Sequence, residues 1–133
     1  MTPPDSLLYE YSVIRYVPRV DREEFLNIGL LMMCKRQKWI QGKISINAGK
    51  LSAFDKTLDI NLLKHQAGMF ENTDLPSEEL PVEEKYRWLS AVKSAVLQTS
   101  PSHPGIIIRT NSDLPAIPQL EEEFKRLFHE LVE

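Results

Sequence analysis

Hydrophobic and polar positions alternate in some stretches of the chain and recur at helical spacing in others, which predicts a mixture of strands and helices. Residues Leu7–Val17 are rich in β-branched and aromatic types and end at Pro18, so we expect a first strand there. The run Ile28–Cys34 is apolar at every position except Gly29. A run of this kind indicates a central strand that is covered on both faces of the sheet.

Two pairs of neighbouring segments have the pattern of β-hairpins. The polar turn Lys35–Lys38 separates the central strand from an alternating segment, Trp39–Ile46, and Asn47-Ala-Gly49 then ends this segment with turn residues. Two shorter segments, 95–98 and 106–109, are joined by a link that contains proline and serine. We therefore expect a second hairpin in this part of the chain.

Three segments have apolar residues at helical spacing. One runs from Ile60 to Phe70 behind Asp59, a good N-cap residue, and a short one follows Pro81. The last carries an apolar stripe between Leu120 and Leu131. Together these patterns predict a single α+β domain over residues 1–133, built on one antiparallel sheet of about five strands and three helices.

Composition removes several classes of function. With 133 residues, 42% of them hydrophobic, the chain can bury one core, and its net charge of -3 gives no excess of positive charge for binding nucleic acid. Cys34 is the single cysteine and the three histidines lack metal-ligand spacing, so we expect no disulfide, no metal and no cofactor. The start of the chain has no leader pattern, and no apolar run approaches the ~20 residues that span a bilayer. We expect a cytoplasmic protein without membrane contact.

One group of polar residues runs from the first strand through a turn into the second, and contains Arg15, Arg22, Glu24 and Asn27. By strand alternation the Arg15 side chain lies on the apolar face of its strand, where a guanidinium needs a partner, and Glu24 is the nearest one. Two interpretations stay open: a structural ion pair that pins the turn, or a recognition surface. Gly29, at the start of the next strand, is typical of a bulge or a close backbone approach.

A second polar group contains Gln98, Ser100, Ser102 and His103. A histidine paired with a serine is the arrangement that nucleophilic catalysis needs. However, serine and proline in a connection are mostly turn formers, and neither G-x-S-x-G nor H-E-x-x-H occurs in the chain. We therefore assign no catalytic residue and treat this group as a candidate binding site.

These residues fall into four segments whose order and spacing resemble the bacterial family of domain of unknown function 3037 (DUF3037): Tyr11–Pro18, Arg22–Gly29, Arg87–Ala91 and Gln98–Gly105. The resemblance covers nearly the whole chain and brings no established activity. It implies a small cytoplasmic protein with a protein partner, because members are often encoded beside HipA-like kinases. Where the family tends to have Ala-Pro-Arg-Ser, this chain has Ala-Val-Lys93-Ser. Lysine keeps the positive charge but cannot form the bidentate hydrogen bonds that arginine makes to an anion.

The sequence therefore leaves three functional hypotheses. The first is an interaction module for a partner protein such as a HipA-like kinase. The second is a small enzyme or a binding protein for a phosphorylated or nucleotide-like ligand, which would use Arg15, Arg22, Lys93, Gln98, Ser100 and His103. The third is a structural protein that self-associates as a homo-oligomer. In geometric terms we expect the two polar groups to lie close together on one rim of the sheet.

Overall fold

The structure, a computed structural model, describes residues 6–18, 23–91, 94, 96–109 and 113–133. Its strands are β1 (Ser6–Tyr16), β2 (Leu26–Cys34), β3 (Trp39–Ile44), β4 (Leu97–Thr99) and β5 (His103–Ile108). Its helices are α1 (Ala48–Phe54), α2 (Ile60–Ala67), the 3-10 helix η2 (Gly68–Glu71), α3 (Val82–Ser90) and α4 (Ala116–Leu131). The predicted class, α+β with one antiparallel sheet of five strands, is confirmed.

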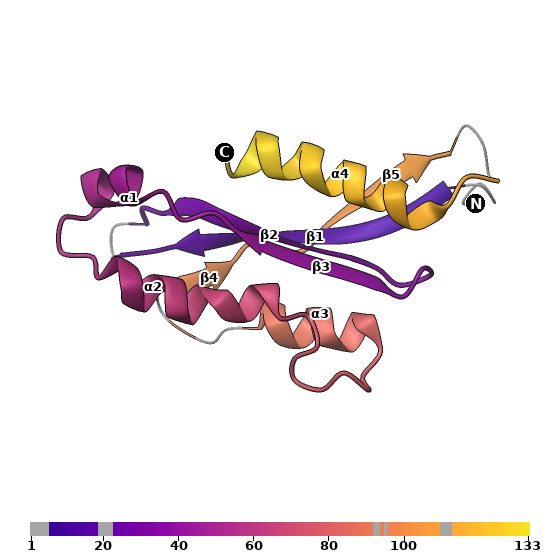
Figure 1. Ribbon diagram of the computed structural model, residues 1–133, viewed down its shortest axis with the longest axis horizontal. Helices are drawn as coiled ribbons and strands as arrows, with labels where there is room; N and C mark the ends of the chain where they lie inside the picture. Colours follow the sequence, from indigo (N-terminus) through magenta and orange to yellow (C-terminus); the bar gives the residue numbers. More distant parts are fainter. Residues whose placement is uncertain (1–5, 19–22, 92–93, 95, 110–112) are drawn as a thin grey trace.

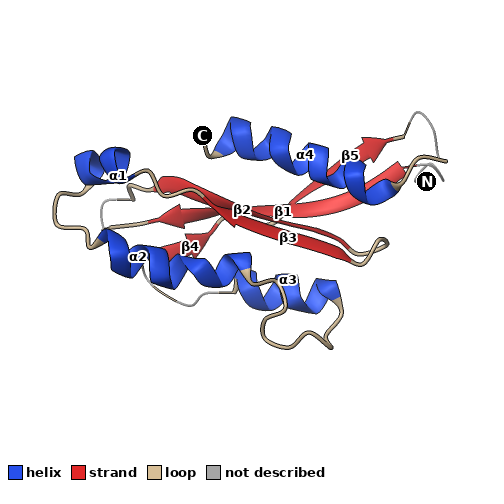
Figure 2. Cartoon of the chain, viewed as in Figure 1, coloured by secondary structure: helices blue, strands red, loops and turns tan. Residues whose placement is uncertain are grey.

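The sheet has the order β3-β2-β1-β4, and β5 also pairs with β1 (Figure 2). β4 pairs with residues 14–16 of β1, and β5 pairs with residues 6–11. The expected hairpin between the two last strands is therefore wrong. Both strands run antiparallel to β1 and hence in the same direction as each other. They can pair in tandem because β1 is 11 residues long.

Helices cover the sheet on both sides (Figure 1). On one face, Leu31 and Met33 of β2 belong to a core with residues of α1, α2 and α3. On the other face, Leu30 and Met32 of β2 pack with the apolar stripe of α4. β2 is thus buried on both sides, which confirms the central strand predicted from its apolar run.

The structure contains one α-helix more than the three expected, because α1 was predicted as a turn. Asn47 is its N-cap, and the Asn47 Oδ1 accepts a hydrogen bond from the Lys50 N–H at 2.9 Å. Leu51, one turn further on, is buried in the core. Asparagine is favoured both in turns and at N-caps, so the local pattern did not separate these two structures.

A β-bulge interrupts the pairing of β1 with β2. Ile14 pairs with Gly29 but Arg15 pairs with Asn27, which leaves Ile28 as the extra residue. A Cβ atom at Gly29 would lie 2.5 Å from a side-chain carbon of β3. The bulge and close approach expected at Gly29 are therefore confirmed, and the bulge sets which residue stands opposite Arg15.

Candidate functional site

Three of the predicted site residues form a row across the sheet. Arg15 of β1 pairs with Asn27 of β2 on one side and with Gln98 of β4 on the other. Directly paired residues of antiparallel strands point to the same face, which is the face that α4 covers elsewhere. The structure thus brings members of both predicted polar groups together.

Two contacts fix side chains of this row. The guanidinium carbon of Arg15 lies 4.2 Å from the centre of the Phe25 ring, and the Asn27 Nδ2 donates a hydrogen bond to the Leu131 carbonyl oxygen at 2.9 Å. The Arg15 Nε and the Asn27 Oδ1 are buried and have no hydrogen-bond partner among the described residues. The ion pair between Arg15 and Glu24 stays a prediction, and Glu24 itself is exposed just before β2.

The serines of the second polar group hold the break between β4 and β5. The Ser100 Oγ accepts a hydrogen bond from the Val13 N–H at 2.9 Å, which ties the break to β1. The Ser102 Oγ lies 2.8 Å from the hydroxyl oxygen of Tyr86, which is also 2.8 Å from the Oγ of the fully buried Ser12. Burial raises the pKa of Tyr86, so its hydroxyl stays protonated. The contacts of both serines are structural.

A cleft of about 440 Å³ opens beside these hydroxyl groups. Two more hydroxyls in its wall are also engaged by the protein itself. The Thr99 Oγ1 donates to the Ser90 carbonyl oxygen at 2.7 Å, and the Ser90 Oγ donates to the Tyr86 carbonyl oxygen at 2.7 Å. The hydroxyl protons in this wall are therefore used within the protein. A ligand in the cleft would meet hydroxyl oxygens that accept hydrogen bonds.

His103 lies apart from the row. Its ring is 5.3 Å from the ring of Tyr11, which precedes Arg15 by four residues on β1 and so lies roughly 13 Å along the strand from it. No described contact joins His103 to Ser100 or Ser102, so the pair needed for nucleophilic catalysis is not present among these residues. The remaining candidates, Arg22 and Lys93, lie outside the described residues.

An exposed apolar surface at one end of the sheet was missed by sequence reasoning. Leu8 pairs with Ile106 and is 53% exposed, while Ile106 and Ile108 are 45% and 68% exposed. These three residues, here called the open face, point away from α4, whereas α3 packs under β2 and β3 on the same side of the sheet (Figure 1). The available signal was three successive isoleucines in one strand, which place apolar side chains on both faces.

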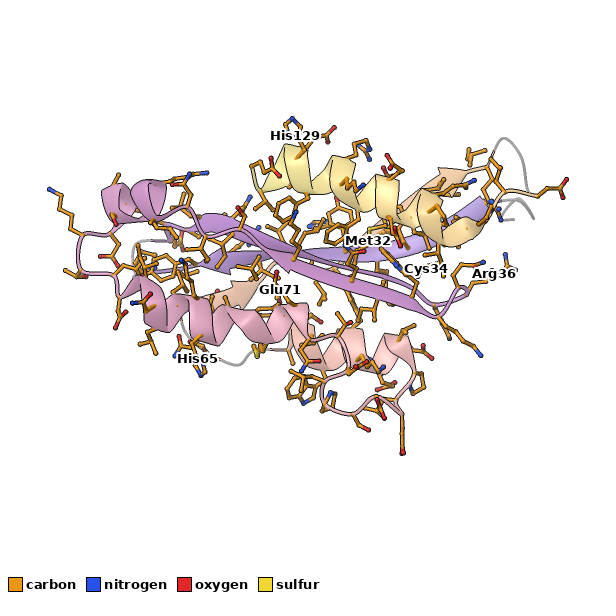
Figure 3. All side chains as sticks on the ribbon, in the orientation of Figure 1. Met32, Cys34, Arg36, His65, Glu71 and His129 are labelled. Atoms are coloured by element: carbon orange, nitrogen blue, oxygen red, sulfur yellow. The ribbon has the colours of Figure 1, made fainter. Side chains whose placement is uncertain are left out.

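Two basic residues border the open face. Lys35 and Arg36, in the turn between β2 and β3, are exposed and line a shallow pocket of about 530 Å³ together with Leu8. Figure 3 shows Arg36 at the tip of this hairpin. The polar turn predicted at Lys35–Lys38 therefore stands next to exposed apolar side chains.

The two outer edges of the sheet differ. The edge of β3 is closed by η2, since the Ile44 N–H donates to the Glu71 Oε2 at 3.2 Å and a Cβ at Gly42 would overlap the Phe70 carbonyl oxygen. No described strand pairs with the outer side of β5. That edge therefore presents backbone hydrogen-bonding groups next to the open face.

A comparison with protein families supports the resemblance found in the motifs. The model of the family described as protein of unknown function (DUF3037) matches residues 11–132, which is nearly the whole chain. The chain belongs to the DUF3037 family. No curated protein and no solved structure matches it. The DUF3037 match spans the row at Arg15, the strand break and α4, but it assigns none of them an activity.

Two kinds of site are not found in the described part of this DUF3037 chain. Its His, Cys, Asp and Glu residues form no group of three or more that could hold a metal ion. His65 and His129, for example, lie on helices on opposite sides of the sheet (Figure 3). Within the same residues, no helix combines the length and the apolar character that spanning a bilayer requires.

Proposed function

We propose that this DUF3037 chain is a protein-interaction module that binds a partner protein through the open face. One observation carries the proposal: Leu8, Ile106 and Ile108 form an apolar surface on paired strands, with 45% to 68% of each residue exposed. At the centre of the sheet, helices cover both faces. Exposed apolar patches with polar rims are typical of protein interaction sites.

The open face contributes apolar area to a complex. Fully burying a leucine or isoleucine side chain contributes about 1.5–3 kcal/mol, and roughly half of each residue is still exposed here, so covering them adds about half of that for each. Clustered apolar residues of this kind dominate binding energy. The strand pairing between β1 and β5 holds Leu8 and Ile106 in place before a partner arrives. Little conformational entropy is then lost on binding.

Charge beside the open face indicates the chemistry of the partner. Lys35 and Arg36 are exposed on one border, and they favour a partner whose contact surface is acidic around an apolar centre. The family resemblance suggests a HipA-like kinase, because such kinases are often encoded beside family members. We include this kinase in the proposal as the first partner to test.

The experiment is co-expression of the tagged chain with a HipA-like kinase, followed by affinity and size-exclusion chromatography. Leu8→Lys places a charge in the open face, and Leu62→Lys is the matched control because Leu62 is 52% exposed on α2. We expect the wild type and Leu62→Lys to elute with the kinase and Leu8→Lys to elute alone. Equal binding by all three would reject the open face, and repeated elution of the wild type alone would reject the kinase.

A second candidate function is suggested by the row at Arg15. The buried Arg15 Nε and Asn27 Oδ1 lack partners among the described residues, and a small polar ligand could supply them. The test is a thermal-shift measurement with nucleotides and inorganic phosphate on the wild type and on Arg15→Lys. A rise in melting temperature in the wild type that is smaller in Arg15→Lys supports this candidate, and no rise with any ligand rejects it.

A further inference from the structure

The outer edge of β5 points to a second interaction, which is independent of the partner proposed above. Strands at the edges of monomeric proteins normally carry a lysine or another charge that blocks pairing with a further chain. β5 has the sequence HPGIII and contains no Lys, Arg, Asp or Glu. Pro104 restricts pairing only near its start, so Ile106–Ile108 form an edge without charged residues and without a further strand among the described residues.

A groove of about 680 Å³ lies along this edge on the side of α4. Ile107 lines this groove on the face of α4, beside Leu114, which is 48% exposed just before α4 begins. Apolar side chains therefore flank the β5 edge on both faces of the sheet: Leu114 on one face, and Ile106 and Ile108 on the other. A strand added to β5 in the plane of the sheet would place its own side chains beside all of them.

We propose that the occupant of this edge is a second copy of the same chain, with the two β5 strands paired antiparallel about a two-fold axis. The groove carries both signs of charge, and they are matched within one chain: Arg126 pairs with Glu123 and Glu130, and Glu122 pairs with Lys125. A two-fold axis places this groove opposite its own copy, so two surfaces of matched charge meet without net repulsion. A partner of one charge sign would meet like charge in the same groove.

Self-pairing also brings no like charges together within the strand. In the antiparallel alignment centred on Ile107, Ile107 stands opposite its own copy and Ile106 opposite Ile108, so isoleucine meets isoleucine at all three positions. The six residues of β5 alone bury less than the ~1,200 Å² of a stable interface, so contacts in the groove are needed as well. We therefore expect a dimer that dissociates on dilution.

The proposed dimer leaves the open face accessible. Antiparallel pairing in the plane of the sheet keeps equivalent faces on the same side, so the two five-stranded sheets join and their open faces become neighbours. A dimer would then present Leu8 twice to a partner. The two proposals remain separable, because Leu8 belongs to the open face and Leu114 to the groove.

The test is the molar mass in solution by light scattering and sedimentation, over a dilution series spanning roughly 1 μM to 1 mM. We expect the mass to rise from the 15.4 kDa of one chain toward twice that value, and to stay at one chain for Ile108→Lys and Leu114→Lys. Leu8→Lys and Leu62→Lys should dimerise like the wild type. Circular dichroism checks that each variant is folded.

A cross-linking measurement covers the case in which Ile108→Lys does not fold. Ile108→Cys changes only side-chain size and polarity, and the native Cys34 is buried. A short bismaleimide linker should join two Ile108→Cys chains and should not join two Leu62→Cys chains. The proposal is overturned if the wild type stays a monomer throughout, if the dimer survives Leu114→Lys, or if both cysteine variants cross-link equally.

Discussion

Leu8 of β1 and Ile106 of β5 stand directly opposite each other on a face of the sheet that is bare at this end. Their chain neighbours Leu7 and Ile107 form the next pair, point to the other face and pack with α4. The same two strands are thus covered on one side and exposed on the other. This asymmetry is the basis of the proposed interaction.

Leu8→Lys should leave the free energy of unfolding within about 0.5 kcal/mol of the wild type, because an exposed position tolerates a charge. Leu7→Ala should lower it by about 2–5 kcal/mol, because Leu7 is only 2% exposed under α4. Urea unfolding monitored by circular dichroism measures both. A loss of more than about 2 kcal/mol in Leu8→Lys would equal the cost expected at a buried position such as Leu7. That result would mean that Leu8 is buried in solution.

Tyr86→Phe should lower the free energy of unfolding by about 1–3 kcal/mol, because it leaves the hydroxyl of the fully buried Ser12 without its partner. Ser102→Ala removes the other hydrogen bond of Tyr86 at an exposed position and should cost less. The measurement is again urea unfolding. Equal stability of Tyr86→Phe and the wild type would contradict a structural role for this hydroxyl cluster.

Gly42→Ala should disrupt the edge of β3, because the added Cβ would overlap the Phe70 carbonyl oxygen. We expect a loss of more than about 2 kcal/mol, or a failure to fold, since backbone must move to make room. Gly49→Ala is the control, because its nearest atom is 3.6 Å away and alanine favours the helix α1. Unchanged melting of Gly42→Ala would show that η2 does not close this edge.

The pair formed by Tyr16 and Asp55 predicts that the free energy of unfolding falls at both low and high pH. The Tyr16 hydroxyl donates to the Asp55 Oδ2 at 2.7 Å, and this hydrogen bond lowers the pKa of Asp55 below its ordinary 3.8. Asp55 therefore stabilises the fold above that value, and the effect is lost as the pH falls through its lowered pKa. Burial and the same hydrogen bond raise the pKa of Tyr16 from 10.0 to about 12.

Stability from Tyr16 is therefore complete below pH 10 and is lost as the pH rises through about 12. The measurement is the free energy of unfolding against pH in the wild type and Tyr16→Phe. The variant should be less stable near neutral pH, and its stability should change less at both low and high pH. Parallel curves for the two proteins would contradict the coupling.

Some of the fold could be predicted because its patterns are local and repeated. The apolar run of β2 and the stripe of α4 each contain enough apolar positions to specify both the type of element and its buried face. The N-cap at Asp59 was likewise readable, and its Oδ1 accepts the Leu62 N–H at 3.1 Å. In these cases local propensity and tertiary packing favour the same structure.

The pairing of β4 and β5 could not be predicted in this way. Two short strands joined by a Pro- and Ser-rich link have the pattern of a hairpin, and only the length of β1 allows both to pair with it in tandem. Whether a strand pairs with a strand that is near in sequence or with a distant one depends on the whole sheet. The sequence of either strand does not contain that information.

The candidate sites likewise include one that the sequence indicated and one that it did not. Arg15 and Asn27 belong to one predicted polar group, and the structure brings Gln98 of the other group to the same row. The open face was missed because alternation shows which residues share a face of a strand, but not whether a helix covers that face. Leu8 and Leu7 are the same residue type in the same strand, and only the position of α4 distinguishes them.

Hydrogen–deuterium exchange of the chain, free and in complex with its co-purified partner, tests the central claim most directly. The account predicts that partner binding slows amide exchange in residues 6–11 and 103–108 and in the turn that holds Lys35 and Arg36. Exchange in α2, which packs on the same face of the sheet at its opposite end (Figure 1), should not change. Protection confined to α2, or to the row at Arg15, would contradict the open face as the binding surface.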